Sequence, residues 1–153
     1  MQPSADNAYL ADHAELLLGS YERLLHTPLV SHGDRVLRAK ALYESPVVVV
    51  SHDTSADPVF NYANLAAQRL FELEWERFVQ LPSRLSAGPV HRDERQRLLA
   101  IVTRQGYIDD YSGIRVAASG KQFRIERATV WNVTCTDGTY AGQAACFSRW
   151  EYV

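Results

Sequence analysis

The stretch from Tyr107 to Trp150 is the feature that most constrains the fold. It reads as three strand-like segments separated by Ser119-Gly120 and Asp137-Gly138. An Asp-Gly pair supplies the positive φ values of a tight hairpin turn, so the pattern predicts three consecutive antiparallel strands. The residues before this meander favour helices and two short strands, so the chain is predicted to be an α+β domain.

The elements ahead of the meander are predicted from apolar periodicity and from turn residues. Apolar residues at spacings of four and three predict an amphipathic helix from Asn7 to His26. Asp34 and Asn64 are placed to cap two further helices, because their side-chain oxygens can accept free backbone N–H groups. The remaining elements are helical segments at 35–44, 65–71, 75–81 and 93–104, and strands at 47–52 and 59–62.

Composition indicates one globular domain. The 153 residues are 46% hydrophobic and 22% charged, without a run of the ~18 apolar residues that a membrane span needs. The N-terminus is polar and acidic, unlike a signal peptide, so we expect a cytoplasmic location. The net charge is -2 and charges of both signs are mixed along the chain, so the sequence does not indicate the basic surface that binds nucleic acid. The arginines at 92, 95 and 97 alternate with acids and are expected on a solvated helix face.

Cys135 and Cys146 are predicted to stay reduced. If Asp137-Gly138 is a two-residue turn, Cys135 lies opposite Tyr140 and Cys146 lies opposite Thr129. The cysteines are then roughly 20 Å apart at ~3.3 Å per residue, too far for a disulfide. His13, His26 and His32 show neither i,i+4 pairing nor neighbouring cysteines, so no metal site is expected.

Several short motifs resemble those of one known family. Their order and spacing are similar to those of the MEKHLA domain. This PAS-like domain stands alone in bacteria and forms the C-terminal end of plant class III homeodomain-leucine zipper proteins. The motifs are Phe60-Asn61-Tyr62-Ala63-Asn64, Leu81-Pro82-Ser83-Arg84-Leu85-Ser86, Val130-Trp131-Asn132 and Gly142-Gln143-Ala144-Ala145. The resemblance implies a PAS-like fold, a five-stranded antiparallel sheet with helices on one face. It covers about residues 46–150, so we expect an N-terminal helical extension at 1–45 and the PAS-like domain at 46–153.

The resemblance to PAS domains predicts no cofactor. Flavin-binding PAS domains of the LOV type carry an adduct-forming cysteine where this chain has Ser83, so the thiol for flavin photochemistry is missing. Arg84 is the one residue that matches their phosphate-binding motif. Haem-binding PAS domains use a histidine on the long helix, and residues 93–104 contain none. We therefore expect neither flavin nor haem.

Strict alternation in the fourth strand predicts which residues line a ligand cavity. Arg127, Thr129 and Trp131 fall on its more apolar face, and the hairpin register places Cys146 opposite Thr129. The candidate ligand-binding residues are therefore Arg127, Trp131, Thr129, Cys146, Tyr62 and Arg84. An inward arginine would hold a carboxylate or phosphate, so the ligand is expected to carry an anionic group.

The sequence leaves two alternatives to this site open. Arg127 can instead form a structural salt bridge or lie exposed at the strand end. A bulge in the strand would reverse the faces, so that Asn132 and Gln143 point inward. His52-Asp53 resembles a catalytic dyad, but adjacent strand residues face opposite ways, so a turn aspartate beside an exposed histidine is expected.

These features favour a sensory or ligand-binding module that is not an enzyme. We expect it to bind an unknown small molecule and to signal in trans to a partner or through a homodimer. The helix at 7–26 suits helix pairing, which favours a homodimer through it; folding back onto Val130, Ala145 and Phe147 of its own sheet is the alternative. A protein-interaction module with a filled cavity and a small cone-shaped α+β enzyme are the other candidate functions.

Overall fold

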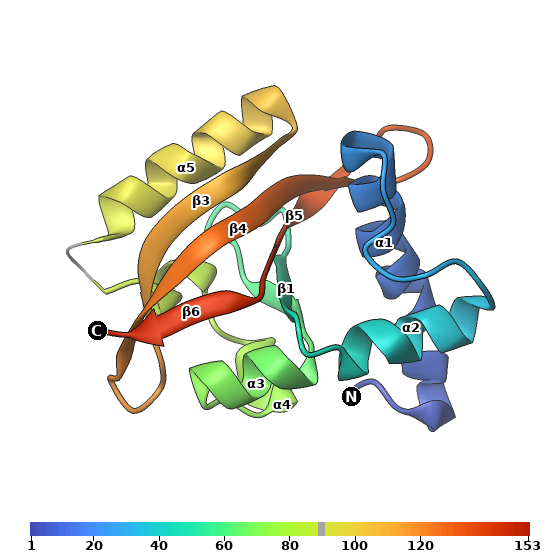
Figure 1. Cartoon of the computed structure of the whole chain (residues 1–153), viewed down its shortest axis with the longest axis horizontal. Helices are drawn as coiled ribbons and strands as arrows, with labels where there is room; N and C mark the ends of the chain where they lie inside the picture. The colour runs from blue at the N-terminus through green and yellow to red at the C-terminus, as the bar shows by residue number, and fades with distance from the viewer. Residues whose placement is uncertain (89–90) are drawn as a thin grey trace.

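The computed structural model describes residues 1–88 and 91–153 as an antiparallel sheet with helices on both faces (Figure 1). The main strands are β1 (Val48–His52), β2 (Phe60–Ala63), β3 (Tyr107–Val116), β4 (Gln122–Thr134) and β5 (Tyr140–Phe147). They pair in the order β2-β1-β5-β4-β3, so the predicted antiparallel sheet is confirmed. A further short strand, β6 (Arg149–Tyr152), pairs with the first part of β4.

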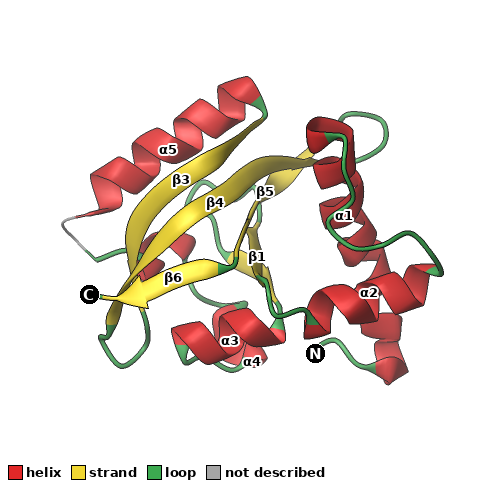
Figure 2. Cartoon of the chain, in the orientation of Figure 1, coloured by secondary structure: helices red, strands yellow, loops and turns green. Residues whose placement is uncertain are grey.

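Helices cover the two faces of this sheet (Figure 2). We call the face that carries Val50, Phe123 and Val130 the inner face, and the one that carries Val49 and Trp131 the outer face. The inner face is covered by α3 (Leu65–Phe71), α4 (Trp75–Phe78) and α5 (Arg92–Gln105), and the outer face by α1 (Ala11–Leu25), on which α2 (Arg35–Glu44) packs. The 3-10 turns are η1 (Ala5–Leu10) and η2 (Ser83–Ser86). No helix of the described residues is long and apolar enough to cross a membrane.

The N-terminal helix is shorter than its apolar pattern predicts. The pattern predicts residues 7–26, but the α-helical turns begin at Ala11. The backbone is left-handed at Ala8, Tyr9 and Leu10, with φ values of 54°, 54° and 52°. Because a right-handed helix cannot contain such residues, the chain turns sharply before α1.

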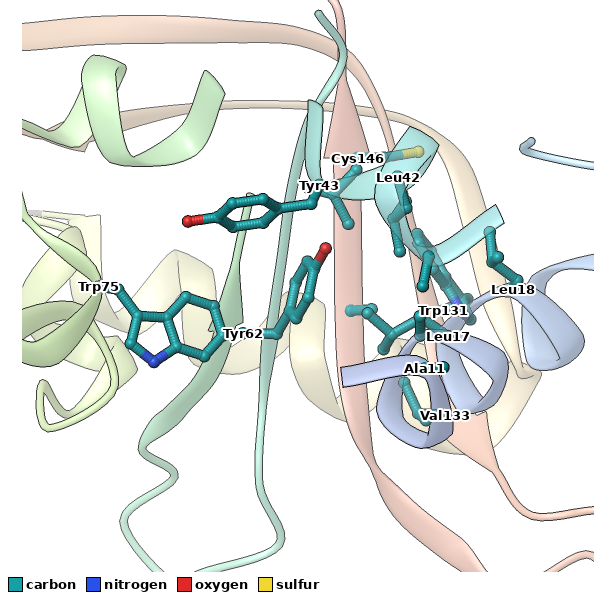
Figure 3. Close-up of a cluster of buried hydrophobic side chains, with 14 residues drawn as sticks. Ala11, Leu17, Leu18, Leu42, Tyr43, Tyr62, Trp75, Trp131, Val133 and Cys146 are labelled. Carbon is teal, nitrogen blue, oxygen red and sulfur yellow. The ribbon is translucent and has the colours of Figure 1, made fainter. Parts of the chain in front are cut away.

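The helix α1 buries its apolar side on the outer face of its own sheet. Leu17 and Leu18 are fully buried there, and the Tyr21 ring packs edge-on against Trp131 with 5.1 Å between ring centres. Figure 3 shows the cluster to which these leucines and Trp131 belong. The apolar residues that favoured helix pairing are thus used within the chain.

A β-bulge at Arg127 decides which side chains of β4 face inward. Phe123 and Ile125 lie on the inner face before the bulge, whereas Ala128 and Val130 lie on it afterwards. Arg127 itself has a φ of 51° and is exposed. Because strand side chains alternate with a period of two, one extra residue exchanges the two faces for the rest of the strand.

The bulge also changes which residues of the sheet lie under the N-terminal helix. Val130, Ala145 and Phe147, which were expected to receive a folded-back helix, lie on the inner face. The outer face instead offers Trp131 and Val133 to α1.

Asn64 joins three elements and confirms the predicted helix cap. Its Oδ1 accepts the N–H of Ala67, in the first turn of α3, at 3.1 Å and the N–H of Val49 at 3.0 Å. Its Nδ2 donates to the carbonyl oxygens of Val47 at 2.7 Å and Leu42 at 3.1 Å. A fully buried amide that makes four hydrogen bonds fixes the start of α3 against β1 and the end of α2.

Both cysteines are free thiols, as predicted. Cys146 pairs with Thr129 in the predicted register. Nearer the turn, Tyr140 pairs with Thr134 and not with Cys135, because β5 has one extra residue there. The predicted register therefore holds for the body of the hairpin and is wrong by one residue at its tip.

Candidate functional site

A cavity of about 70 Å³ lies between the inner face of the sheet and α5. Most of its wall is apolar, and comes from Val50, Phe60, Phe71, Leu98, Ile125, Val130 and Phe147. Polar side chains also reach the wall, from His52, Ser86, Arg95, Tyr111, Arg115 and Gln143. An apolar cavity with a few converging polar groups is the usual form of a small-molecule site.

Arg95 and Arg115 are buried at this wall, and neither has a carboxylate partner among residues 1–88 and 91–153. Their exposed fractions are 6% and 8%. Arg95 donates to Ser83 Oγ, and Arg115 donates to the carbonyl oxygen of Ile114 at 2.9 Å and lies over the Tyr111 ring. Burial, and then the charge of Arg115, lower the pKa of Arg95 to about 10, so Arg95 stays protonated at neutral pH.

His52 adds an unused acceptor to the same wall. Its Nδ1 lies 2.9 Å from the carbonyl oxygen of Asp53, so Nδ1 carries the proton and Nε2 is an acceptor. Nε2 is buried without a hydrogen-bond partner in the described part of the chain. Burial lowers the pKa of His52 and the charge of Arg95 lowers it further, so the ring is neutral near pH 7.

Gln143 connects the cavity to α5. Its Nε2 lies 3.1 Å from three acceptors: the carbonyl oxygen of Leu99, Thr103 Oγ1 and Asn132 Oδ1. Asn132 Nδ2 donates in turn to the carbonyl oxygen of Val102 at 3.0 Å. Two amide side chains of the sheet thus hold the C-terminal half of α5, and one of them lines the cavity.

None of the residues predicted to bind a ligand lines this cavity: Arg127, Trp131, Thr129, Cys146, Tyr62 and Arg84. Arg127 is exposed at the bulge, so its predicted inward position is wrong. Trp131 lies on the outer face for the same reason. The alternative with a bulge applies instead, and Gln143 takes the inward position.

The other predicted site residues lie in two places outside the cavity. Tyr62 and Cys146 belong with Trp131 to the outer-face cluster of Figure 3, and Thr129 pairs with Cys146. Burial raises the pKa of the Cys146 thiol to about 12. Arg84 lies about half exposed, where its Nε is 3.1 Å from a carboxylate oxygen of Asp57.

Sequence reasoning missed both buried arginines, although a pattern for each exists. Arg95 was expected on a solvated helix face, yet Arg95, Leu98 and Val102 follow the i, i+3, i+7 spacing of one helix face, and all three are buried. Arg115 shares the face of Tyr111 by strand alternation. Because arginines are mostly exposed in folded proteins, neither pattern by itself indicates a buried arginine.

The His52-Asp53 pair does not form a dyad. Asp53 Oδ1 accepts the backbone N–H groups of Ser55 at 3.1 Å and Val59 at 3.0 Å, which is the turn role that was predicted. His52 is buried, so its predicted exposure is wrong. In residues 1–88 and 91–153, no three His, Cys, Asp or Glu side chains are grouped to hold a metal ion.

Solved structures with related folds are PAS and LOV domains. The PAS domain of a protein from Colwellia psychrerythraea superposes with a TM-score of 0.62 at 16% identity, over 76% of this chain and 94% of that chain. A fungal LOV domain photoreceptor gives a TM-score of 0.58 at 12% identity, over 90% of this chain and 91% of that one. An RNA-binding light-oxygen-voltage receptor gives 0.59 at 16% identity, over 72% of this chain and 31% of the receptor. The fold is therefore PAS-like.

Sequence comparison is more specific. Homeobox-leucine zipper protein ATHB-9 of Arabidopsis thaliana is 27% identical over 124 residues, which are 79% of this chain but 14% of that protein. The MEKHLA domain model matches residues 11–152, a range that includes α1 and α2. The predicted division of the chain at residue 45 stays a prediction. The match over nearly the whole chain shows that it belongs to the MEKHLA domain family.

Proposed function

We propose that this chain is a sensory domain that binds a small molecule in the cavity between the inner face and α5. The observation that carries the proposal is the set of incompletely bonded polar groups on an apolar wall, from His52, Arg95 and Arg115. A buried polar group without a partner costs about 1–3 kcal/mol. A ligand that supplied the missing partners would recover that free energy.

Gln143 offers a route from the cavity to the surface. A ligand that drew its amide away from Leu99 and Thr103 would loosen the contact between β5 and α5. The helix could then shift on the sheet, and a shift of a surface helix is a change that a second protein can detect.

We infer that the signal passes to a partner protein or to a second copy of the chain. Homodimer formation stays a prediction, and pairing through α1 gains no support from a helix whose apolar side is buried on its own sheet. Trp150 and Tyr152 of β6 are 38% and 55% exposed and offer apolar contact area. A cytoplasmic location also stays a prediction.

We infer further that the domain is not an enzyme and carries no coloured cofactor. The Asp53 carboxylate is engaged in a turn, so it is not available to orient His52 as a base. Ser83 is buried and hydrogen-bonded to Arg95, and a serine cannot form the flavin adduct of a cysteine. Visible absorption in the purified protein would contradict the second inference.

A module that binds partners without a ligand is the second candidate. The cavity of about 70 Å³ is small compared with the ~300–1,000 Å³ of sites for drug-sized ligands. The protein's own side chains therefore fill most of the space between the sheet and the helices. This volume limits the ligand to a few non-hydrogen atoms.

Native mass spectrometry of freshly purified protein separates the two candidates. A ligand-binding domain is expected to carry an extra mass that disappears after unfolding and refolding. The Ala145→Val variant, which adds carbon atoms at the cavity wall, should carry less of it, whereas Ala141→Val, outside the cavity on the same strand, should carry as much as the wild type. A bare wild-type mass would favour the module without a ligand.

A further inference from the structure

We propose that the cavity takes a short-chain hydroxycarboxylate, whose carboxylate pairs with Arg95 and Arg115 and whose hydroxyl donates to His52 Nε2. This inference rests on the proposed function and specifies its ligand. It follows from the charge, the free hydrogen-bonding groups and the size of the cavity.

The charge of the cavity calls for an anion. Arg95 and Arg115 bring two guanidinium groups to the wall, and among the residues that the structure describes no Asp or Glu lines that wall. Asp57 interacts electrostatically with Arg95, but its side chain is 52% exposed and forms an ion pair with Arg84. Buried charges without partners are costly, and a bound anion would offset that cost.

The donors of the arginines favour a carboxylate. Each guanidinium has several N–H donors in one plane, and each arginine uses one of its nitrogens as a donor within the described part of the chain. The planar fork matches the two oxygens of a carboxylate. Ser83 and the ring of Tyr111 hold the two guanidinium groups in place, so the donors are already oriented.

The rest of the cavity restricts the remainder of the ligand. Its volume of about 70 Å³ holds a few water-sized groups, which excludes nucleotides and aromatic cofactors. The rest of the wall is mainly aliphatic and aromatic, from residues such as Val50, Ile125 and Phe147, and suits a short alkyl chain. His52 presents an acceptor and no donor to this space, so its partner must carry a hydrogen, as a hydroxyl does.

Isothermal titration calorimetry with four probes tests the inference on the whole 153-residue chain after any co-purified ligand has been removed. The probes are lactate, 3-hydroxypropionate, propionate and lactamide. At least one hydroxycarboxylate should bind at least about tenfold more tightly than propionate, which lacks the hydroxyl, and than lactamide, which lacks the charge.

Variants locate the binding groups. Arg95→Gln and Arg115→Gln should each weaken the hydroxycarboxylate at least about tenfold, whereas Arg127→Gln, which removes an exposed arginine from the bulge, should leave affinity unchanged. His52→Phe should remove the preference over propionate. If Arg95→Gln fails to fold, Arg95→Lys keeps the charge without the fork and should still weaken binding.

The outcomes separate this inference from the proposed function. Equal binding of lactamide, or equal loss of affinity in Arg127→Gln, overturns the carboxylate assignment and leaves a small-molecule function in place. Equal binding of propionate overturns the role of the hydroxyl and of His52. Failure of every probe to bind overturns the inference, and the native mass measurement then decides the function by itself.

Discussion

Gly142 lies so close to His52 that a Cβ atom at Gly142 would stand 2.0 Å from the carbonyl oxygen of His52. The φ of Gly142 is 129°, a value that other residues rarely adopt. The glycine therefore allows β1 and β5 to approach at the point where His52 and Gln143 enter the cavity wall.

Replacing Gly142 should damage both the fold and the site. We expect Gly142→Ala to lower the free energy of unfolding by about 3 kcal/mol or more, because the backbone at His52 or at residue 142 would have to move to make room for the added carbon. The control is Gly138→Ala, which also has a positive φ of 89° but nothing within 4 Å of the added carbon, and should cost only about 1–2 kcal/mol. Urea unfolding measures both, and equal losses would show that the close approach is not important.

Asn64→Ala should destabilise the protein more than loss of a simple helix cap. The variant removes a hydrogen bond from the N–H of Val49 in β1 and from the carbonyl oxygens of Val47 and Leu42, so we expect a loss of about 3 kcal/mol or more. Asp34 is the matched cap, exposed and bonded to the N–H of Leu37, and Asp34→Ala should cost about 1 kcal/mol. Denaturant midpoints that coincide for the two variants would contradict the bridging role.

Stability should fall as the pH drops below 6.5, partly through His13. Burial lowers the pKa of His13 from 6.5 to about 4, with its Nε2 3.1 Å from Ser51 Oγ. Between these values the unfolded chain binds a proton that the folded protein does not, so the free energy of unfolding decreases by up to about 1.4 kcal/mol per pH unit. Folded His52 acts in the same direction.

Substitution of His13 isolates its share of this acid loss. His13→Gln should lose less stability between pH 6.5 and pH 5 than the wild type, whereas replacement of the exposed His32 by Gln should follow the wild-type profile. Parallel profiles for all three proteins in urea unfolding would refute the assignment.

Deletion of residues 1–27 should cause aggregation. It removes α1 and uncovers Trp131 and Val133 on the outer face of the sheet, together with Leu42 of α2 in the same apolar cluster. Light scattering of the full and truncated chains measures the result. A dimeric wild type that becomes a well-behaved monomer on truncation would show instead that α1 pairs with a second subunit.

Local signals predicted most of the fold, and the site depended on a feature that they do not encode. Asp34, Asn64 and Asp137-Gly138 act through their own side chains or backbone preferences, so their roles are visible in the sequence. The bulge at Arg127 is not visible, because a left-handed residue is expected to be Gly, Asn or Asp. The bulge at this one residue reverses the two faces for the second half of β4. Gln143 therefore lines the cavity, and Trp131, which was predicted to line it, does not.

The burial of Arg95 depends on tertiary packing in the same way. The helix face that it shares with Leu98 is set by how α5 lies on the sheet, and a local charge pattern cannot report that orientation.

The most direct test of the ligand site is a two-dimensional proton–nitrogen NMR comparison of the freshly purified protein with the same protein after unfolding and refolding. Removal of a ligand from the cavity should shift the side-chain amide resonances of Gln143, while the indole resonances of Trp131 and Trp150, which lie outside the cavity, stay in place. Superimposable spectra, or a shift at Trp131 with none at Gln143, would contradict the proposal that this cavity holds the ligand.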